Sequence, residues 1–96
     1  MKGMTHEEVR GLKVEDKLHL IWWDSDKGVG HGDKLFDGLV TVDDVTDMDI
    51  CCQVNEGDRA GSYVSIMLQA PSGSGAPWLI NRAPGRGWFE FFHPTN

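Results

Sequence analysis

Long apolar runs are missing from this 96-residue chain, since no stretch reaches the roughly 18–20 residues that a membrane span requires. The N-terminal segment MKGMTHEEVRG also lacks the apolar core of a secretory signal peptide. These two absences predict a protein that has no membrane partner.

Cysteine is scarce, and its two copies are adjacent, at Cys51 and Cys52. Neighbouring side chains in a strand point to opposite faces, and a disulfide between neighbours is strained. We therefore expect two free thiols and a reducing, cytoplasmic location.

Basic residues are few, because 9 Lys and Arg stand against 15 Asp and Glu, which gives a net charge of −6. A phosphate backbone would be repelled over most of such a surface, so the balance excludes direct binding to nucleic acid and suits a basic partner. The remaining composition, 40% hydrophobic and 25% charged, is that of a globular protein. The length predicts a single domain over residues 1–96.

Catalytic and metal-binding motifs are also absent. The chain has no Gly-x-Ser-x-Gly elbow, and Ser72 and Ser74 lie in a Gly- and Pro-rich segment that would not hold a nucleophile in place. The four histidines have no paired spacing, and residues 24–28, DSDKG, lack the later ligands of a calcium loop. We expect a protein that is not an enzyme and that needs no metal or cofactor.

What the chain does contain is a series of short segments with strand-like alternation, separated by turns. Thr5 and Glu8 have the spacing of a capping box, which predicts one short helical turn before Gly11. Alternation places Ile50, Cys52 and Val54 on one face of a strand, and Val64, Ile66 and Leu68 on one face of the next. Gly38 in the middle of a strand indicates a bulge or sharp bend. The expected strands cover residues 17–23, 35–42, 50–54, 62–68, 77–82 and 88–93. This pattern predicts an all-β fold, a small antiparallel five- to six-stranded barrel or sandwich.

The segment GLKVEDKLHLIW, residues 11–22, resembles the opening of SH3-like and Tudor-like small barrels, where a tight polar turn leads into the first long strand. Glu15 stands where those barrels usually have glycine. The OB-fold is the nearest alternative, but it has a helix where this chain has only the short segment 55–61. The resemblance implies a small β-barrel fold.

Aromatic residues beside carboxylates are the strongest functional signal. Alternation assigns Trp22 to the core with Leu18 and Leu20, and turns Trp23 outward next to Asp24 and Asp26. Something should cover that ring: the loop, a partner or a second copy of the chain. The leading hypothesis is a protein–protein interaction module or small inhibitor that presents two acidic segments, a loop at 24–33 and a turn at 43–49, to a basic partner. A phage or mobile element is one source that would fit such an inhibitor. The expected contact residues are Trp23, Asp24, Asp26, Asp43, Asp44, Asp47 and Tyr63.

An alternative hypothesis is a small-ligand binder that holds an anionic or nucleotide-like molecule. Its expected binding residues are Arg59, Arg82, Arg86 and Trp88, because guanidinium groups and indole rings suit such ligands. The location of the charge distinguishes the two hypotheses: a basic partner requires the aspartates, whereas an anionic ligand requires the arginines.

Overall fold

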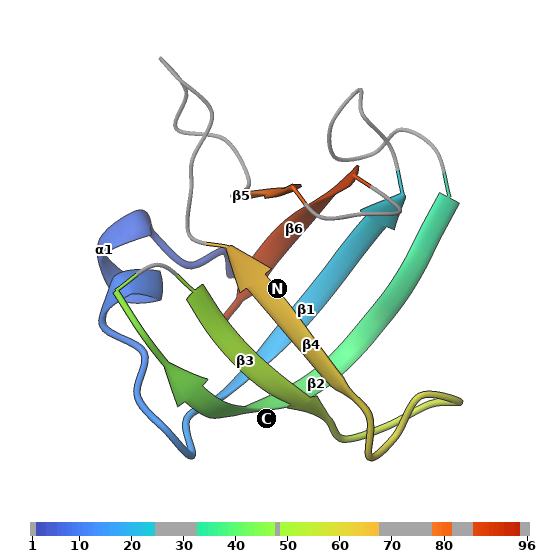
Figure 1. Cartoon of the computed structure of the whole chain (residues 1–96), viewed down its shortest axis with the longest axis horizontal. Helices are drawn as coiled ribbons and strands as arrows, with labels where there is room; N and C mark the ends of the chain where they lie inside the picture. The colour runs from blue at the N-terminus through green and yellow to red at the C-terminus, as the bar shows by residue number, and fades with distance from the viewer. Residues whose placement is uncertain (1, 25–32, 48, 68–77, 82–85, 95–96) are drawn as a thin grey trace.

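The structure is a computed structural model that describes residues 2–24, 33–47, 49–67, 78–81 and 86–94. The chain begins with one short helix and continues with strands (Figure 1). The elements are α1 (His6–Arg10), β1 (Lys17–Asp24), β2 (Asp33–Val45), β3 (Asp49–Val54), β4 (Tyr63–Met67), β5 (Trp78–Asn81) and β6 (Arg86–Phe92). The prediction of an all-β fold with a short N-terminal helical turn is confirmed.

The described strands form one six-stranded antiparallel sheet in the order β4-β3-β2-β1-β6-β5. Strand β2 is the longest, and it bends so that its first part pairs with β1 and its last part with β3. The two end strands of the order, β4 and β5, come into contact, so the sheet curls around one interior (Figure 1). This arrangement is that of a small antiparallel β fold.

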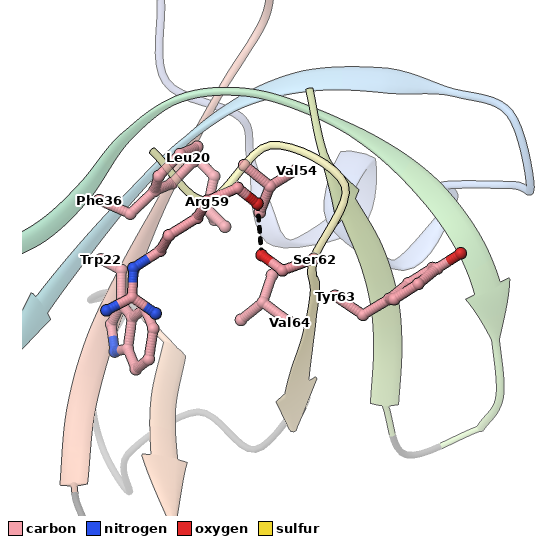
Figure 2. Close-up of a pocket in the computed structure, with 8 residues that line it drawn as sticks. All are labelled: Leu20, Trp22, Phe36, Val54, Arg59, Ser62, Tyr63 and Val64. Atoms are coloured by element: carbon pink, nitrogen blue, oxygen red, sulfur yellow. Dashed lines mark hydrogen bonds between the residues drawn. The ribbon is translucent and has the colours of Figure 1, made fainter. Parts of the chain in front are cut away.

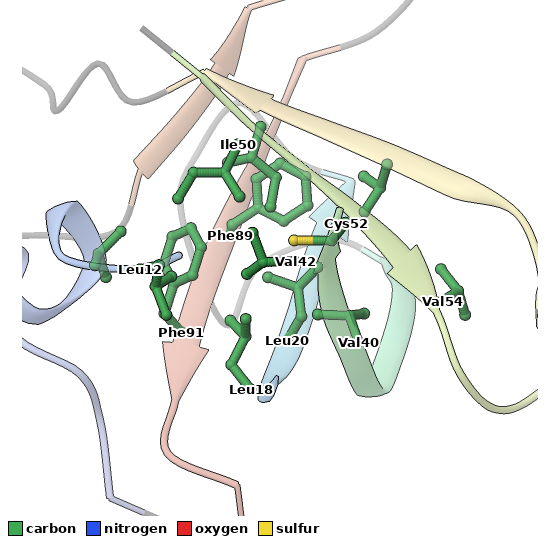
Figure 3. Packing of buried hydrophobic residues seen from close by; sticks show 13 residues of the cluster. Leu12, Leu18, Leu20, Val40, Val42, Ile50, Cys52, Val54, Phe89 and Phe91 are labelled. Carbon is green, nitrogen blue, oxygen red and sulfur yellow. The ribbon is translucent and has the colours of Figure 1, made fainter. Parts of the chain in front are cut away.

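The interior is filled by apolar side chains from all the long strands (Figure 3). Strand β3 shows the expected alternation, with Ile50, Cys52 and Val54 buried, and β4 buries Val64 and Ile66. Leu68, the third residue of the predicted β4 stripe, lies outside the described residues. The buried cluster consists of Val9, Leu12, Leu18, Leu20, Val40, Val42, Ile50, Cys52, Val54, Val64, Ile66, Phe89 and Phe91. Burial of this kind stabilises by roughly 1.5–3 kcal/mol per large side chain.

The N-terminal segment covers one end of the core. Thr5 and Glu8 form the predicted capping box, with the Glu8 backbone N–H donating to Thr5 Oγ1 at 3.1 Å. The backbone N–H of Met4 donates to the carbonyl of Phe91, which ties this segment to β6. Within the described ranges, no helix combines the length and the hydrophobicity needed to cross a bilayer.

A tight turn at residues 13–16 leads into β1. The Asp16 backbone N–H donates to the Lys13 carbonyl at 3.0 Å, and the Lys13 N–H donates to the Asp16 carboxylate at 2.8 Å. Glu15 has a φ of 79°. This left-handed conformation favours glycine, because a Cβ is crowded there.

The expectation of a bulge at Gly38 is wrong. Gly38 pairs in regular register with Leu20. The register shifts instead on either side of it: opposite Trp22 and Trp23, where β2 skips Leu35, and between Val42 and Asp44 in the pairing with β3. Gly38 is required for a different reason, since a Cβ there would lie 2.8 Å from Glu56 Oε1.

The limits of the two acidic segments also need correction. Asp43 and Asp44 lie in β2 rather than in a turn, because the bulge lets the strand continue to Val45. Asp24 ends β1 and pairs with Asp33 at the start of β2, so both belong to strands and not to a loop.

Candidate functional site

The outer surface of β2, β3 and β4 carries most of the predicted partner-binding residues. Backbone pairing places Thr41, Gln53 and Tyr63 in one row and Asp44, Cys51 and Ser65 in the next. We call this surface, together with the exposed Asp43 and Asp47 and the half-buried Asp49 at its end, the acidic face.

Tyr63 is the most exposed large hydrophobic residue of the described chain, at 57%. It belongs to the acidic face because its neighbour Val64 points into the core. A half-apolar ring with a hydroxyl group on an exposed surface is typical of the side chains that anchor protein interfaces.

The carboxylates of the acidic face act together on a nearby thiol. Burial raises the pKa of Cys51, and the charges of Asp43, Asp44 and Asp49 raise it further. The three carboxylates therefore create a negative potential at the centre of this surface. Both thiols are free, as expected, and burial raises the pKa of Cys52 to about 12.

In the part of the chain that the structure describes, the exposed carboxylates of this face have no paired cation. None of the ion pairs among the described residues involves Asp43, Asp44 or Asp47. Asp49 differs, because its carboxylate accepts a hydrogen bond from the Thr46 hydroxyl at 2.6 Å and helps to close the β2–β3 turn.

Trp23 lies at the opposite end of β2 from the acidic face, as do Asp24 and Asp33, the two described residues of the predicted segment 24–33. Residues 25–32 of that segment lie outside the described residues. As alternation predicts, Trp22 packs against the core and Trp23 lies on the other face of β1. The chain itself covers the Trp23 ring: its indole N–H donates to Glu90 Oε1 at 2.8 Å, and Lys34 Nζ lies 5.3 Å from the ring centroid.

Two charged residues near Trp23, Asp37 and Lys34, are partnered as well. Asp37 accepts hydrogen bonds from His19 and, at 3.2 Å, from Lys34 Nζ. The bond to His19, with Lys34 adding to the effect, lowers the pKa of Asp37. Asp24 is exposed beside this group, and Asp26 lies outside the described residues.

A small cavity opens at one end of the curled sheet, with a volume of about 50 Å³ (Figure 2). Trp22 forms one wall and stacks on Phe89, with ring centroids 5.6 Å apart. The guanidinium carbon of Arg59 lies 5.7 Å from the centroid of the Trp22 ring, and Figure 2 shows the Tyr63 ring pointing away from both. The residues that line the cavity are Leu20, Trp22, Phe36, Val54, Arg59, Ser62, Tyr63 and Val64.

Of the residues predicted to hold an anionic ligand, the structure places only Arg59 at this cavity. Arg82 lies outside the described residues, and Arg86 and Trp88 belong to β6, with side chains outside the description. Sequence reasoning missed Trp22 and Phe36 as cavity residues. Their alternation marks them as core residues, and no local signal shows that the sheet is open beside them.

The described ranges contain no group of three His, Cys, Asp or Glu side chains that could hold a metal ion. Comparison of the chain with known proteins found no matching family, no matching curated protein and no matching solved structure. The chemistry of the two surfaces is therefore the basis for assigning a function.

Proposed function

We propose that this protein is a non-enzymatic interaction module that presents the acidic face to a basic surface of a protein partner. One observation carries the proposal: Asp43, Asp44 and Asp47 are exposed and form no ion pair among the described residues, and strand pairing puts Asp44 one row from Tyr63 on the outer face of β2–β4. Exposed charges that form no ion pair among the described residues suit electrostatic complementarity with another molecule.

The two kinds of residue contribute differently to binding. The aspartates attract a basic partner over about 8 Å at physiological ionic strength, and they mainly raise the association rate. The Tyr63 ring loses water on contact and slows dissociation, as aromatic anchors do. Added salt should therefore weaken binding through the aspartates and leave the contribution of Tyr63.

Self-association through the acidic face is disfavoured. A two-fold interface brings the same patch of each subunit together, so the carboxylates of two copies would face each other. A basic partner removes that repulsion, which is why we assign this face to a different protein.

An SH3-like arrangement is part of the proposal. It is supported by a meander from β1 to β4, by β6 returning beside β1, and by the tight turn at residues 13–16 before β1. In such a framework the acidic face belongs to the consecutive strands β2, β3 and β4. The simplest role for such a small binding module is that of an inhibitor, which blocks its partner by covering part of the partner's surface.

Affinity capture with the tagged full-length chain, from the cells in which it is made, tests the proposal. We expect the captured protein to be lost with Asp43→Asn/Asp44→Asn and reduced at least tenfold with Tyr63→Ala. The matched control is Asp24→Asn/Asp33→Asn, which changes net charge equally at the other end of β2 and should leave capture intact. Equal loss with both double variants would show that net charge alone drives association, and the acidic face would not be the binding surface.

A further inference from the structure

The cavity beside Trp22 has the composition of a binding site for a small amphiphilic molecule. Side chains of Leu20, Phe36, Val54 and Val64 line it, and the Trp22 ring forms one wall. Ligand sites typically combine such apolar walls with a small number of polar groups that fix orientation. The volume of about 50 Å³ exceeds the roughly 10–15 Å³ that one water needs, and it is smaller than the roughly 150 Å³ cavity that takes up benzene.

Arg59 provides the polar group. Its guanidinium lies over the exposed side of the Trp22 ring, and within the described chain it forms no ion pair with a carboxylate. When an arginine stacks on an aromatic ring, its N–H groups point outward in the plane of the guanidinium. They remain available to donate hydrogen bonds to a second partner. A carboxylate fits this group in bidentate geometry.

The turn that carries Arg59 is firmly held. The Gly61 backbone N–H donates to the Val54 carbonyl at 2.8 Å, and the Ser62 hydroxyl donates to the Arg59 carbonyl (Figure 2). The Glu56 carboxylate accepts a hydrogen bond from the Leu39 N–H at 2.9 Å, which ties the turn to β2. Arg59 is therefore presented from a preorganised segment, as a binding residue requires.

Negative charges near Arg59 limit the affinity. Glu56 and Asp58 line the shallow groove next to the cavity, on the other side of Arg59. They reduce the long-range attraction of an anion, so direct hydrogen bonds to the guanidinium and the fit of the apolar part must provide the binding. We expect a dissociation constant on the order of 1 mM for a ligand of this size.

We infer that this cavity binds a small branched-chain carboxylate, with the branched alkyl group between Trp22 and Val64 and the carboxylate on Arg59. A volume of about 50 Å³ accepts the methyl end of a branched alkyl group, whose remainder lies at the open rim beside Arg59, whereas a benzene-sized ring needs roughly 150 Å³. Tyr63 borders both this cavity and the acidic face, but the ligand contacts proposed here are with Trp22, Val64 and Arg59 and do not rest on the proposed interaction with a protein partner.

A titration followed by methyl-resolved NMR tests the inference on the full chain with 3-methylbutanoate as the probe. The Val54 and Val64 methyl signals should shift in a saturable manner, while the Val9 methyls, at the other end of the core, should not move. Two matched compounds separate the contributions: 3-methylbutanamide keeps the shape without the charge, and acetate keeps the charge without the branched group. Each should bind at least about tenfold more weakly, the factor expected for one charged hydrogen bond or the lost apolar contact.

The protein variants complete the test. Arg59→Gln should raise the half-saturation concentration of 3-methylbutanoate at least about tenfold. The control Lys17→Gln removes an exposed cation at the start of β1 and should not change this concentration. Thermal unfolding of both variants checks that each remains folded at the titration temperature. The inference is overturned if 3-methylbutanoate causes no saturable shift, if the amide or acetate binds equally well, or if Arg59→Gln binds as the natural chain does.

Discussion

Replacing Gly38 with alanine tests the closest contact between β2 and the turn after β3. A Cβ atom at this position would lie 2.8 Å from Glu56 Oε1 and 3.0 Å from Phe36 Cζ. The Glu56 carboxylate must then move, and its hydrogen bond from the Leu39 N–H breaks. The backbone fixes the position of the methyl group, so it cannot turn away from the contact, and Gly38 is buried.

Two opposing contributions set the size of the effect. A hydrogen bond to a charged group contributes about 1.5–3 kcal/mol, and the lower end applies here because water can replace part of it at an exposed site. Alanine is favoured over glycine in a strand by roughly 0.5–1 kcal/mol. Gly38→Ala should therefore lower the free energy of unfolding by about 1 kcal/mol.

A double-mutant cycle with Glu56→Ala identifies the cause. Urea unfolding, followed by tryptophan fluorescence and circular dichroism, gives the free energy of unfolding for the four proteins. In the Glu56→Ala background, the close contact with the Glu56 side chain and the Leu39–Glu56 hydrogen bond are both absent. Gly38→Ala should then be neutral or stabilise the fold by up to about 1 kcal/mol. An equal loss in both backgrounds would refute the reasoning, since the contact with Phe36 would then set the effect.

Three further predictions follow from individual side chains. Glu15→Gly should raise the free energy of unfolding by about 0.5–1 kcal/mol and Glu15→Ala should not, because only glycine relieves the positive φ; urea unfolding measures both. Asp37→Asn should destabilise by under about 1 kcal/mol at pH 7. The lowered pKa of Asp37 stabilises the fold above its usual value of 3.8, so the difference from the natural chain in pH-dependent unfolding should vanish as pH falls below that value. Asp43→Asn/Asp44→Asn should lower the pKa of Cys51 and speed its thiol labelling at pH 8; an unchanged rate would show that burial alone sets that pKa.

The core was the most predictable part of the fold because its signal is local. Period-2 alternation placed Ile50, Cys52 and Val54 on one face, and the structure buries all three. The same pattern distinguished Trp22 from Trp23. A pattern of this kind depends only on strand geometry, which holds whatever the strand pairs with.

The length of β2 could not be predicted from local preference. Aspartate is unfavourable in strands, so Asp43 and Asp44 indicated a turn. A bulge after Val42 overrides that preference, because it lets β2 continue along β3 while both carboxylates remain exposed. The role of Gly38 could not be predicted for a related reason: its close contact is with Glu56, which lies in the turn after the next strand, β3, and becomes a neighbour only in the folded sheet.

The sequence does not show which charged side chains form hydrogen bonds or ion pairs within the fold. These contacts are the basis for choosing between the acidic face and the surface around Trp23. Asp37 finds His19 across the β1–β2 pair, and Glu90 finds Trp23 from a strand 67 residues away, so neither contact has a local signature. These carboxylates contribute to the fold, and a partner that bound them would have to replace contacts already made. Asp43 and Asp44 make no such ion pair within the described residues, so a basic partner could bind them without breaking any. The acidic face is therefore the surface where binding and folding do not compete, which is the physical reason to place the interaction there and not at Trp23.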